Sequence, residues 1–206
     1  MGVDITVLVV DWAHVMDLAP EDRLRVVQES AYADDDADGD GDVVDGWVWP
    51  VGAERSWLGR YEFRGTLGSY KPHFWVADGW EKVRGAVGDG VRAALDEFLE
   101  GLIWWGPEAD VDAEQVDAGV LPSLDGLWRS GPLIVRGPQT VARLRRRWVE
   151  AAPELGRLRE PYAELAARSP GQWIAGFEEF AELVGGWGEV VGEAERRGWG
   201  VVGLPI

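Results

Sequence analysis

The chain has 206 residues, and 37 Asp and Glu against 20 Lys and Arg give it a formal net charge of −17 at pH 7. The absence of cysteine excludes a disulfide framework, a thiolate zinc site and a cysteine nucleophile. The acidity argues against nucleic acid and anionic membrane surfaces as ligands, because both are polyanions, and it favours a basic partner protein.

The first predicted element is a buried strand over Ile5–Val10, a short apolar run rich in β-branched residues. No basic residue precedes this run and Asp11 ends it, so it does not have the pattern of a secretory signal. No apolar stretch of the chain approaches the ~20 residues that cross a bilayer. We therefore expect a cytoplasmic protein that is not associated with membranes.

Between the first strand and the middle of the chain, the pattern is mixed. Pro20 opens a predicted helix that runs to about Tyr32, with acidic residues in its first turn. An acidic loop over 34–45 follows it. Three short extended segments are then expected, at 47–49, 61–63 and 73–76, because each is rich in aromatic residues.

The second half of the chain is predicted to be mainly helical, with a connecting region over 106–132 that contains one short turn near 113–117 and with an extended run at 133–135. The expected helices, in chain order, are 80–105 with a break near Gly88–Gly90, one from Pro138, one from Pro153 to about Arg168 that Pro161 kinks or divides, and one from Ser169–Pro170 to about Arg197. A final apolar strand is expected over 199–204.

Two apolar strands at opposite ends of the chain suggest a small sheet that pairs the termini. The composition is that of a globular protein, with 46% hydrophobic and 28% charged residues, and no polar linker is long enough to separate domains. We therefore predict a single α+β domain over 1–206, dominated by helices, with a sheet that includes 5–10 and 199–204.

The acidic loop resembles the calcium-binding loop of the EF-hand family, because it alternates aspartates and has a glycine at its sixth position, Gly39. Its last position is Asp45 rather than Glu, and a tryptophan-rich extended segment follows instead of a helix. The resemblance thus implies a calcium-type loop without an EF-hand fold; otherwise the segment is a solvated loop. The expected Ca²⁺ ligands are Asp34, Asp36, Asp38, Asp40, Asp42 and Asp45.

One region of this acidic chain carries a local excess of arginines, between Arg129 and Arg159. Guanidinium groups suit carboxylates and phosphates, and arginines one turn apart share a face of a helix. They would either pair with the surplus acids of the same chain or bind an anionic ligand. The candidate anion-binding residues are Arg136, Arg143, Arg146 and Arg147.

Catalytic patterns are mostly missing: there is no nucleophile elbow, phosphate-binding loop, zinc-protease motif or dinucleotide fingerprint. Asp11 follows the first strand, where several phosphoryl-transfer folds place a catalytic carboxylate, and His14 and Asp17 lie close to it in sequence. A metal site there would require a further acid from another strand. His73 lies among aromatic residues, so we expect it to be structural.

Thirteen tryptophans are unusual for a chain of this length, and Trp47, Trp49, Trp57, Trp75 and Trp80 are close in sequence. Most of these rings are expected in the core, and an exposed one would serve as a hot spot for a protein partner.

The C-terminal stretch Phe177–Leu204 combines a long amphipathic helix, the segment Ala194–Gly198 and a closing strand. Together with the opening Met1–Gly2, it resembles the YfbM-like group of uncharacterised bacterial proteins. This resemblance implies a bacterial protein with a helical α+β fold, and it assigns no functional residue.

Three functions follow as hypotheses. The first is a binding protein without a catalytic site, in its concrete form an acidic protein of the immunity type that neutralises a basic partner. That form requires the acidic loop and the neighbouring tryptophans to share one exposed face. The second is a metal-dependent phosphoester hydrolase that uses Asp11. The third is a calcium-binding module that uses 34–45.

Overall fold

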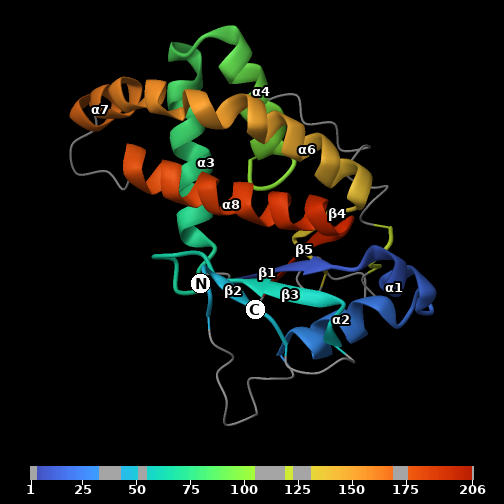
Figure 1. Cartoon of the computed structure of the whole chain (residues 1–206). Coiled ribbons are helices and arrows are strands. Elements are labelled where there is room, and N and C mark those ends of the chain that lie inside the picture. Colours follow the sequence, from blue (N-terminus) through green and yellow to red (C-terminus); the bar gives the residue numbers. More distant parts are fainter. Residues whose placement is uncertain are drawn as a thin grey trace.

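In the computed structural model, which describes residues 4–32, 43–50, 55–104, 119–122, 131–168 and 176–205, a five-stranded antiparallel sheet runs through the molecule (Figure 1). The strand order is β2-β3-β1-β5-β4. Its members are β1 (Ile5–Val10), β2 (Trp47–Val48), β3 (Leu58–Tyr61), β4 (Ile134–Arg136) and β5 (Gly200–Pro205).

The two terminal strands pair with each other, as the sequence predicts. β1 lies between β3 and β5, and Val7 is opposite Tyr61 on one side and Gly203 on the other. Both faces of β1 are buried, which explains its continuous apolar run. The helix-dominated α+β fold class is thereby confirmed.

Helices cover both faces of the sheet (Figure 1). Val7 and Val9 of β1 pack toward the larger helical layer, whereas Leu8 and Val10 pack toward the smaller one. The smaller layer consists of α1 (Trp12–Asp17) and α2 (Arg23–Tyr32). The larger layer consists of α3 (Lys71–Val83), α4 (Asp89–Glu100), α6 (Pro138–Ala151), α7 (Arg159–Arg168) and α8 (Phe177–Arg197).

Several predicted boundaries are confirmed. α3 gives way to a short 3-10 turn, η2 (Arg84–Ala86), before α4 begins at Asp89, so the expected break falls just before Gly90. The helix expected to be divided near Pro161 is the 3-10 segment η3 (Ala152–Leu158) followed by α7. Gly198 ends α8 in a left-handed conformation, with φ of +72°. The expected turn near 113–117 and the helix start at Ser169–Pro170 lie outside the described residues.

The strand predicted over 73–76 is wrong, because these residues belong to α3. Pro72 lies in the first turn of that helix, where proline is tolerated, and the side chains of His73, Val76, Trp80 and Val83 are buried at helical spacing. The aromatic and β-branched composition suggested a strand, but the segment is helical because a helix buries one face of it against the core. The strand predicted at 61–63 is shifted, since β3 ends at Tyr61.

Two tryptophan rings pack directly against the backbone of glycines. A Cβ atom on Gly59 would lie 2.2 Å from the Trp49 ring, and one on Gly200 would lie 2.3 Å from Trp12. Such distances are far below contact, so no residue with a side chain fits at these positions without moving an indole. At these positions, therefore, bare backbone accommodates a large ring.

No helix in the part of the chain that the structure describes has both the length and the apolarity needed to cross a membrane.

Candidate functional site

The predicted calcium loop is mostly outside the described residues: Asp34, Asp36, Asp38, Asp40 and Asp42 belong to the part that is not described. Asp45 is described, and it is an exposed turn residue with a φ of +52°. Among the described residues, no group of three or more His, Asp or Glu side chains could hold a metal ion.

Asp11, the candidate hydrolase residue, caps the start of α1. Its Oδ1 atom accepts hydrogen bonds from the backbone N–H groups of Ala13 at 3.0 Å and His14 at 3.3 Å. The His14 ring stacks on Trp57, with 4.4 Å between the ring centroids. Asp11 thus serves the fold by satisfying N–H groups that the helix itself leaves unpaired.

Three of the four candidate anion-binding arginines are engaged by acceptors of this chain. Arg136 is buried in β4 and donates to the backbone carbonyls of Gly101 and Val135. Arg147 donates to Glu97 at 2.6 Å, and Arg143 lies 3.6 Å from the same carboxylate. Arg146 is exposed on α6. Arg143 and Arg147 thus pair with acids of α4 and α6, whereas Arg136 is held by backbone carbonyls.

A row of aromatic rings lies on the face of the sheet that packs against the larger helical layer. Trp47 and Tyr61 are cross-strand partners. Residues two apart in an extended chain share a face, so Trp49 lies on the same side as Trp47, and Phe63 on the same side as Tyr61. Consecutive ring centroids are 6.5, 5.1, 4.9 and 4.9 Å apart. The members of this aromatic row are, in spatial order, Trp199, Trp49, Trp47, Tyr61 and Phe63.

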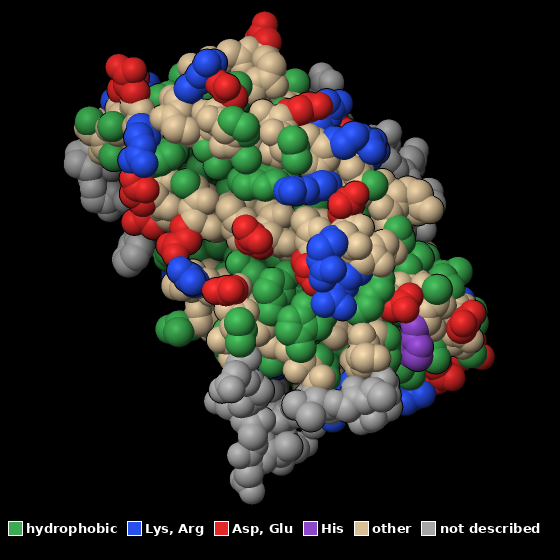
Figure 2. Space-filling model, viewed as in Figure 1, with side chains coloured by type: hydrophobic (Ala, Val, Ile, Leu, Met, Phe, Trp, Pro, Cys, Tyr) green, Lys and Arg blue, Asp and Glu red, His purple; other side chains and the backbone are tan. Residues whose placement is uncertain are grey.

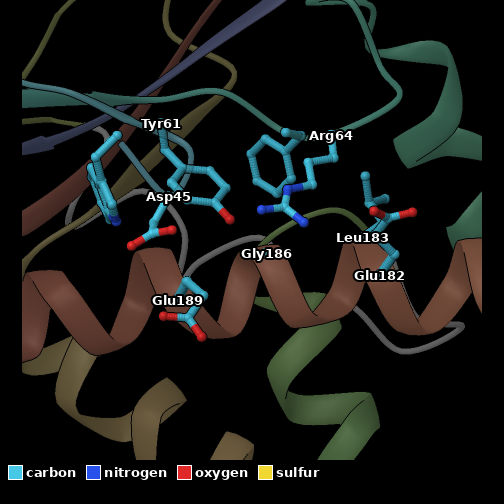
Figure 3. A pocket seen from close by; sticks show the side chains of 9 residues that line it. Asp45, Tyr61, Arg64, Glu182, Leu183, Gly186 and Glu189 are labelled. Atoms are coloured by element: carbon cyan, nitrogen blue, oxygen red, sulfur yellow. The ribbon is translucent and has the colours of Figure 1, made fainter. Parts of the chain in front are cut away.

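Between the middle of the aromatic row and α8 lies a pocket of about 580 Å³, which we call the acidic pocket (Figure 3). From α8, Glu182, Gly186 and Glu189 line it, because residues at i, i+4 and i+7 share one face of a helix. The remaining lining residues are Asp45, Trp47, Tyr61, Phe63, Arg64 and Leu183.

Two glycines allow Tyr61 its position in the acidic pocket. A Cβ atom on Gly186 would lie 2.9 Å from the Phe63 ring and 3.4 Å from that of Tyr61. A Cβ atom on Gly46 would lie 2.8 Å from the Tyr61 ring, and Gly46 also has a φ of +84°, which favours glycine. The turn before β2 and the bare surface of α8 therefore enclose the tyrosine from two sides.

The charge of the acidic pocket is negative, with three carboxylates against the guanidinium of Arg64. Glu182 and Glu189 are exposed and form no ion pair with any residue that the structure describes. Partial burial raises the pKa of the Tyr61 hydroxyl, and the nearby charge of Glu189 raises it further. The hydroxyl accordingly stays protonated at neutral pH, in a pocket where three carboxylates outnumber one guanidinium.

At one end of the aromatic row the chain supplies its own cation. The Arg197 guanidinium lies 4.0 Å from the centroid of the Trp49 ring and 4.8 Å from that of Trp199. Its Nε atom donates to the Glu193 carboxylate at 2.6 Å, and hydrogen bonds from Arg196 and Arg197 lower the pKa of that carboxyl. We call Arg197, Trp49, Trp199 and Glu193 the closed end of the row.

Beyond Phe63 the row meets the core at His73. This side chain is 1% exposed, and its Nδ1 atom accepts a hydrogen bond of 3.1 Å from the Trp187 indole. Burial lowers the pKa of His73 to about 4, so the ring is neutral at physiological pH. The burial of His73 and its hydrogen bond to Trp187 agree with the structural role predicted for it.

Sequence reasoning did not identify Tyr61, Arg64, Glu182 or Glu189 as site residues. The signal was present but weak: two acids seven residues apart flank glycines on an otherwise apolar helix face. Figure 2 shows acidic side chains along the junction of α8 and the sheet, with basic side chains to their right in this view. A scan of family models and searches of curated proteins and of solved structures find no match to this chain. The resemblance to the YfbM-like group therefore stays a prediction.

Proposed function

We propose that this protein is a binding protein that holds a cationic group of a basic partner in the acidic pocket. The observation that carries the proposal is the composition of that pocket, in which three carboxylates and only one guanidinium surround aromatic rings. A cation in such a site gains from ion pairing and from the negative faces of the rings. The net charge of −17 would also accelerate the approach of a basic protein.

The immunity-type hypothesis requires the acidic loop and the tryptophans to share a face, and one structural detail supports this requirement. Asp45, the last residue of that loop, lines the same pocket as Trp47. A partner seated on the pocket would therefore contact Asp45, at the C-terminal end of that segment. Such a protein would neutralise its partner by covering a basic surface, which is how an immunity-type protein of the cytoplasm would act.

The experiment uses a short peptide in which Arg and Lys alternate with Gly, titrated at low and high salt. We expect the Glu182→Gln/Glu189→Gln double variant to bind this peptide about tenfold more weakly than the unmodified protein, since two charged partners are lost. High salt should weaken binding to the unmodified protein, because part of the pairing is exposed to solvent.

A matched control separates the pocket from the overall charge. Glu160 and Glu164 are exposed on α7 and do not line the acidic pocket. The Glu160→Gln/Glu164→Gln variant loses the same net charge, so it should bind like the unmodified protein. Equal weakening by both double variants would show that binding is general electrostatic attraction and would overturn the proposal.

A further inference from the structure

We infer that the cation held in the acidic pocket is a guanidinium, so that the partner inserts an arginine rather than a lysine. This inference rests on the proposed function and narrows it to one side-chain chemistry. It depends on three features of the molecule: the closed end of the aromatic row, the spacing of the carboxylates and the size of the pocket.

The closed end shows that this row accepts a guanidinium. Arg197 lies over Trp49 at 4.0 Å and pairs with Glu193 on α8. Trp47 is the next ring along, and its plane is inclined by only 18° to that of Trp49. The acidic pocket repeats the combination of a tryptophan in or next to β2 and an α8 carboxylate, here Trp47 and Glu189, without an arginine from α8. A planar guanidinium stacks on an indole better than a compact, strongly hydrated ammonium does.

The three carboxylates of the acidic pocket lie apart from one another rather than converging on one point. Glu182 and Glu189 are two helical turns apart, a rise of about 10 Å along α8. Asp45 and Glu189 lie at the Tyr61 end of the pocket and Glu182 lies near Arg64, as Figure 3 shows. A point charge can approach one of these groups at a time. The five N–H donors of a guanidinium fork can reach a carboxylate on one edge and the Tyr61 hydroxyl or a second carboxylate on another.

The size of the pocket selects a side chain over a bare ion. Its volume of about 580 Å³ is many times the ~30 Å³ that one water molecule occupies in the liquid. The rings of Tyr61, Phe63 and Trp47 offer apolar surface to the methylene stem of an entering side chain. Arg64 opposes the incoming cation, because it carries the same charge on the same pocket.

The test compares three peptides that differ only at the central residue, Gly-Gly-X-Gly-Gly with blocked ends, where X is arginine, lysine or citrulline. Citrulline keeps the planar shape of arginine without its charge. Binding is followed by the NMR shift of the Trp47 indole N–H, which the Trp47→Phe variant assigns. We expect the arginine peptide to bind at least about threefold more tightly than the lysine peptide, and the citrulline peptide to bind most weakly.

The outcomes separate the inference from the proposed function. Equal binding of the arginine and lysine peptides would overturn the inference and leave the cationic site standing. Binding of citrulline as tight as that of arginine would overturn both, because charge would then be irrelevant, and so would the absence of any Trp47 shift with all three peptides. The Arg64→Ala variant removes the competing cation without touching the core, so it should bind the arginine peptide more tightly; weaker binding would contradict the assigned role of the carboxylates.

Discussion

The closed end of the aromatic row and the acidic pocket are built from the same parts but differ in one respect. Both combine a tryptophan in or next to β2 with a carboxylate of α8, yet only at the closed end does α8 itself add an arginine; the arginine of the acidic pocket, Arg64, comes from the loop after β3. Where the cation is internal, the arrangement stabilises the fold. At the acidic pocket no arginine of α8 follows Glu189, and there we propose that the same arrangement binds a cation of a partner.

The spacing along α8 explains the difference. Arg197 follows Glu193 by four residues, which brings the two side chains together on the helix surface. Glu189 is followed at three and four residues by Gly192 and Glu193, and Glu182 by Gly185 and Gly186. Neither carboxylate thus has a cation within reach on its own helix. The comparison teaches that an acid beside aromatic rings indicates a binding site only when the residues three and four positions away on its helix include no cation.

The largest expected effect concerns His73, at the buried side of Phe63. The folded pKa of about 4 lies below the ordinary value of 6.5, so between these values the unfolded chain binds more protons. The free energy of unfolding should therefore fall as the pH drops below 6.5, by about 3 kcal/mol once the pH is below 4.

A His73→Asn variant isolates this contribution, because the asparagine oxygen can still accept from the Trp187 indole. Urea unfolding at about pH 7 and about pH 4.5 should show a loss of stability that is smaller in the variant by about 2 kcal/mol. Equal losses in both proteins would mean that His73 is not kept neutral by burial.

The next prediction disrupts the closed end by a steric clash with Trp49. In the Gly59→Ala variant the new methyl group would meet the Trp49 ring at 2.2 Å, so the indole must leave its place over Arg197. We expect a loss of about 2 kcal/mol in the free energy of unfolding, measured by urea denaturation.

Gly185 provides the control for this substitution. It lies inside α8, and a Cβ atom added there would have no neighbouring atom within 4 Å, so Gly185→Ala should raise stability by about 0.5 to 1 kcal/mol through helix propensity. A Gly59→Ala protein as stable as the parent would show that the tryptophan is not confined by the strand.

The smallest effects are expected when one carboxylate at a time is removed from α8. These variants compare the closed end with the acidic pocket directly. Glu193→Gln should lower the free energy of unfolding by about 1 kcal/mol, since the carboxylate holds Arg196 and Arg197. Glu189→Gln should change stability by less than about 0.5 kcal/mol, because no cation of the described chain pairs with it. Thermal melts at several pH values would measure both.

The sign of the pH dependence distinguishes these two carboxylates further. The pKa of Glu193 is lowered in the folded protein, so its contribution is present at neutral pH and is lost as the pH falls through that pKa. The Glu193→Gln variant should therefore match the parent protein at acidic pH and differ at neutral pH. A difference that is independent of pH would point to lost packing instead of lost charge.

What the sequence by itself determined is the set of features that depend on near neighbours in the chain. The run Ile5–Val10 and the apolar strand at the other end indicated a sheet that pairs the termini. The helical stripe and Gly198 indicated α8 and its end, with Gly198 adopting a φ of +72°. These predictions succeeded because burial periodicity, capping and proline geometry act over a few residues.

Only the tertiary structure decided which side chains meet. The segment 73–76 has the composition of a strand, yet α3 buries it at helical spacing. Trp47 and Glu189 are far apart in sequence and line one pocket, because β2 extends the sheet to the place where α8 crosses it. Whether an acid stays unpaired depends on every charged group that the fold brings near it. That information is a property of packing between distant segments, and no local pattern contains it.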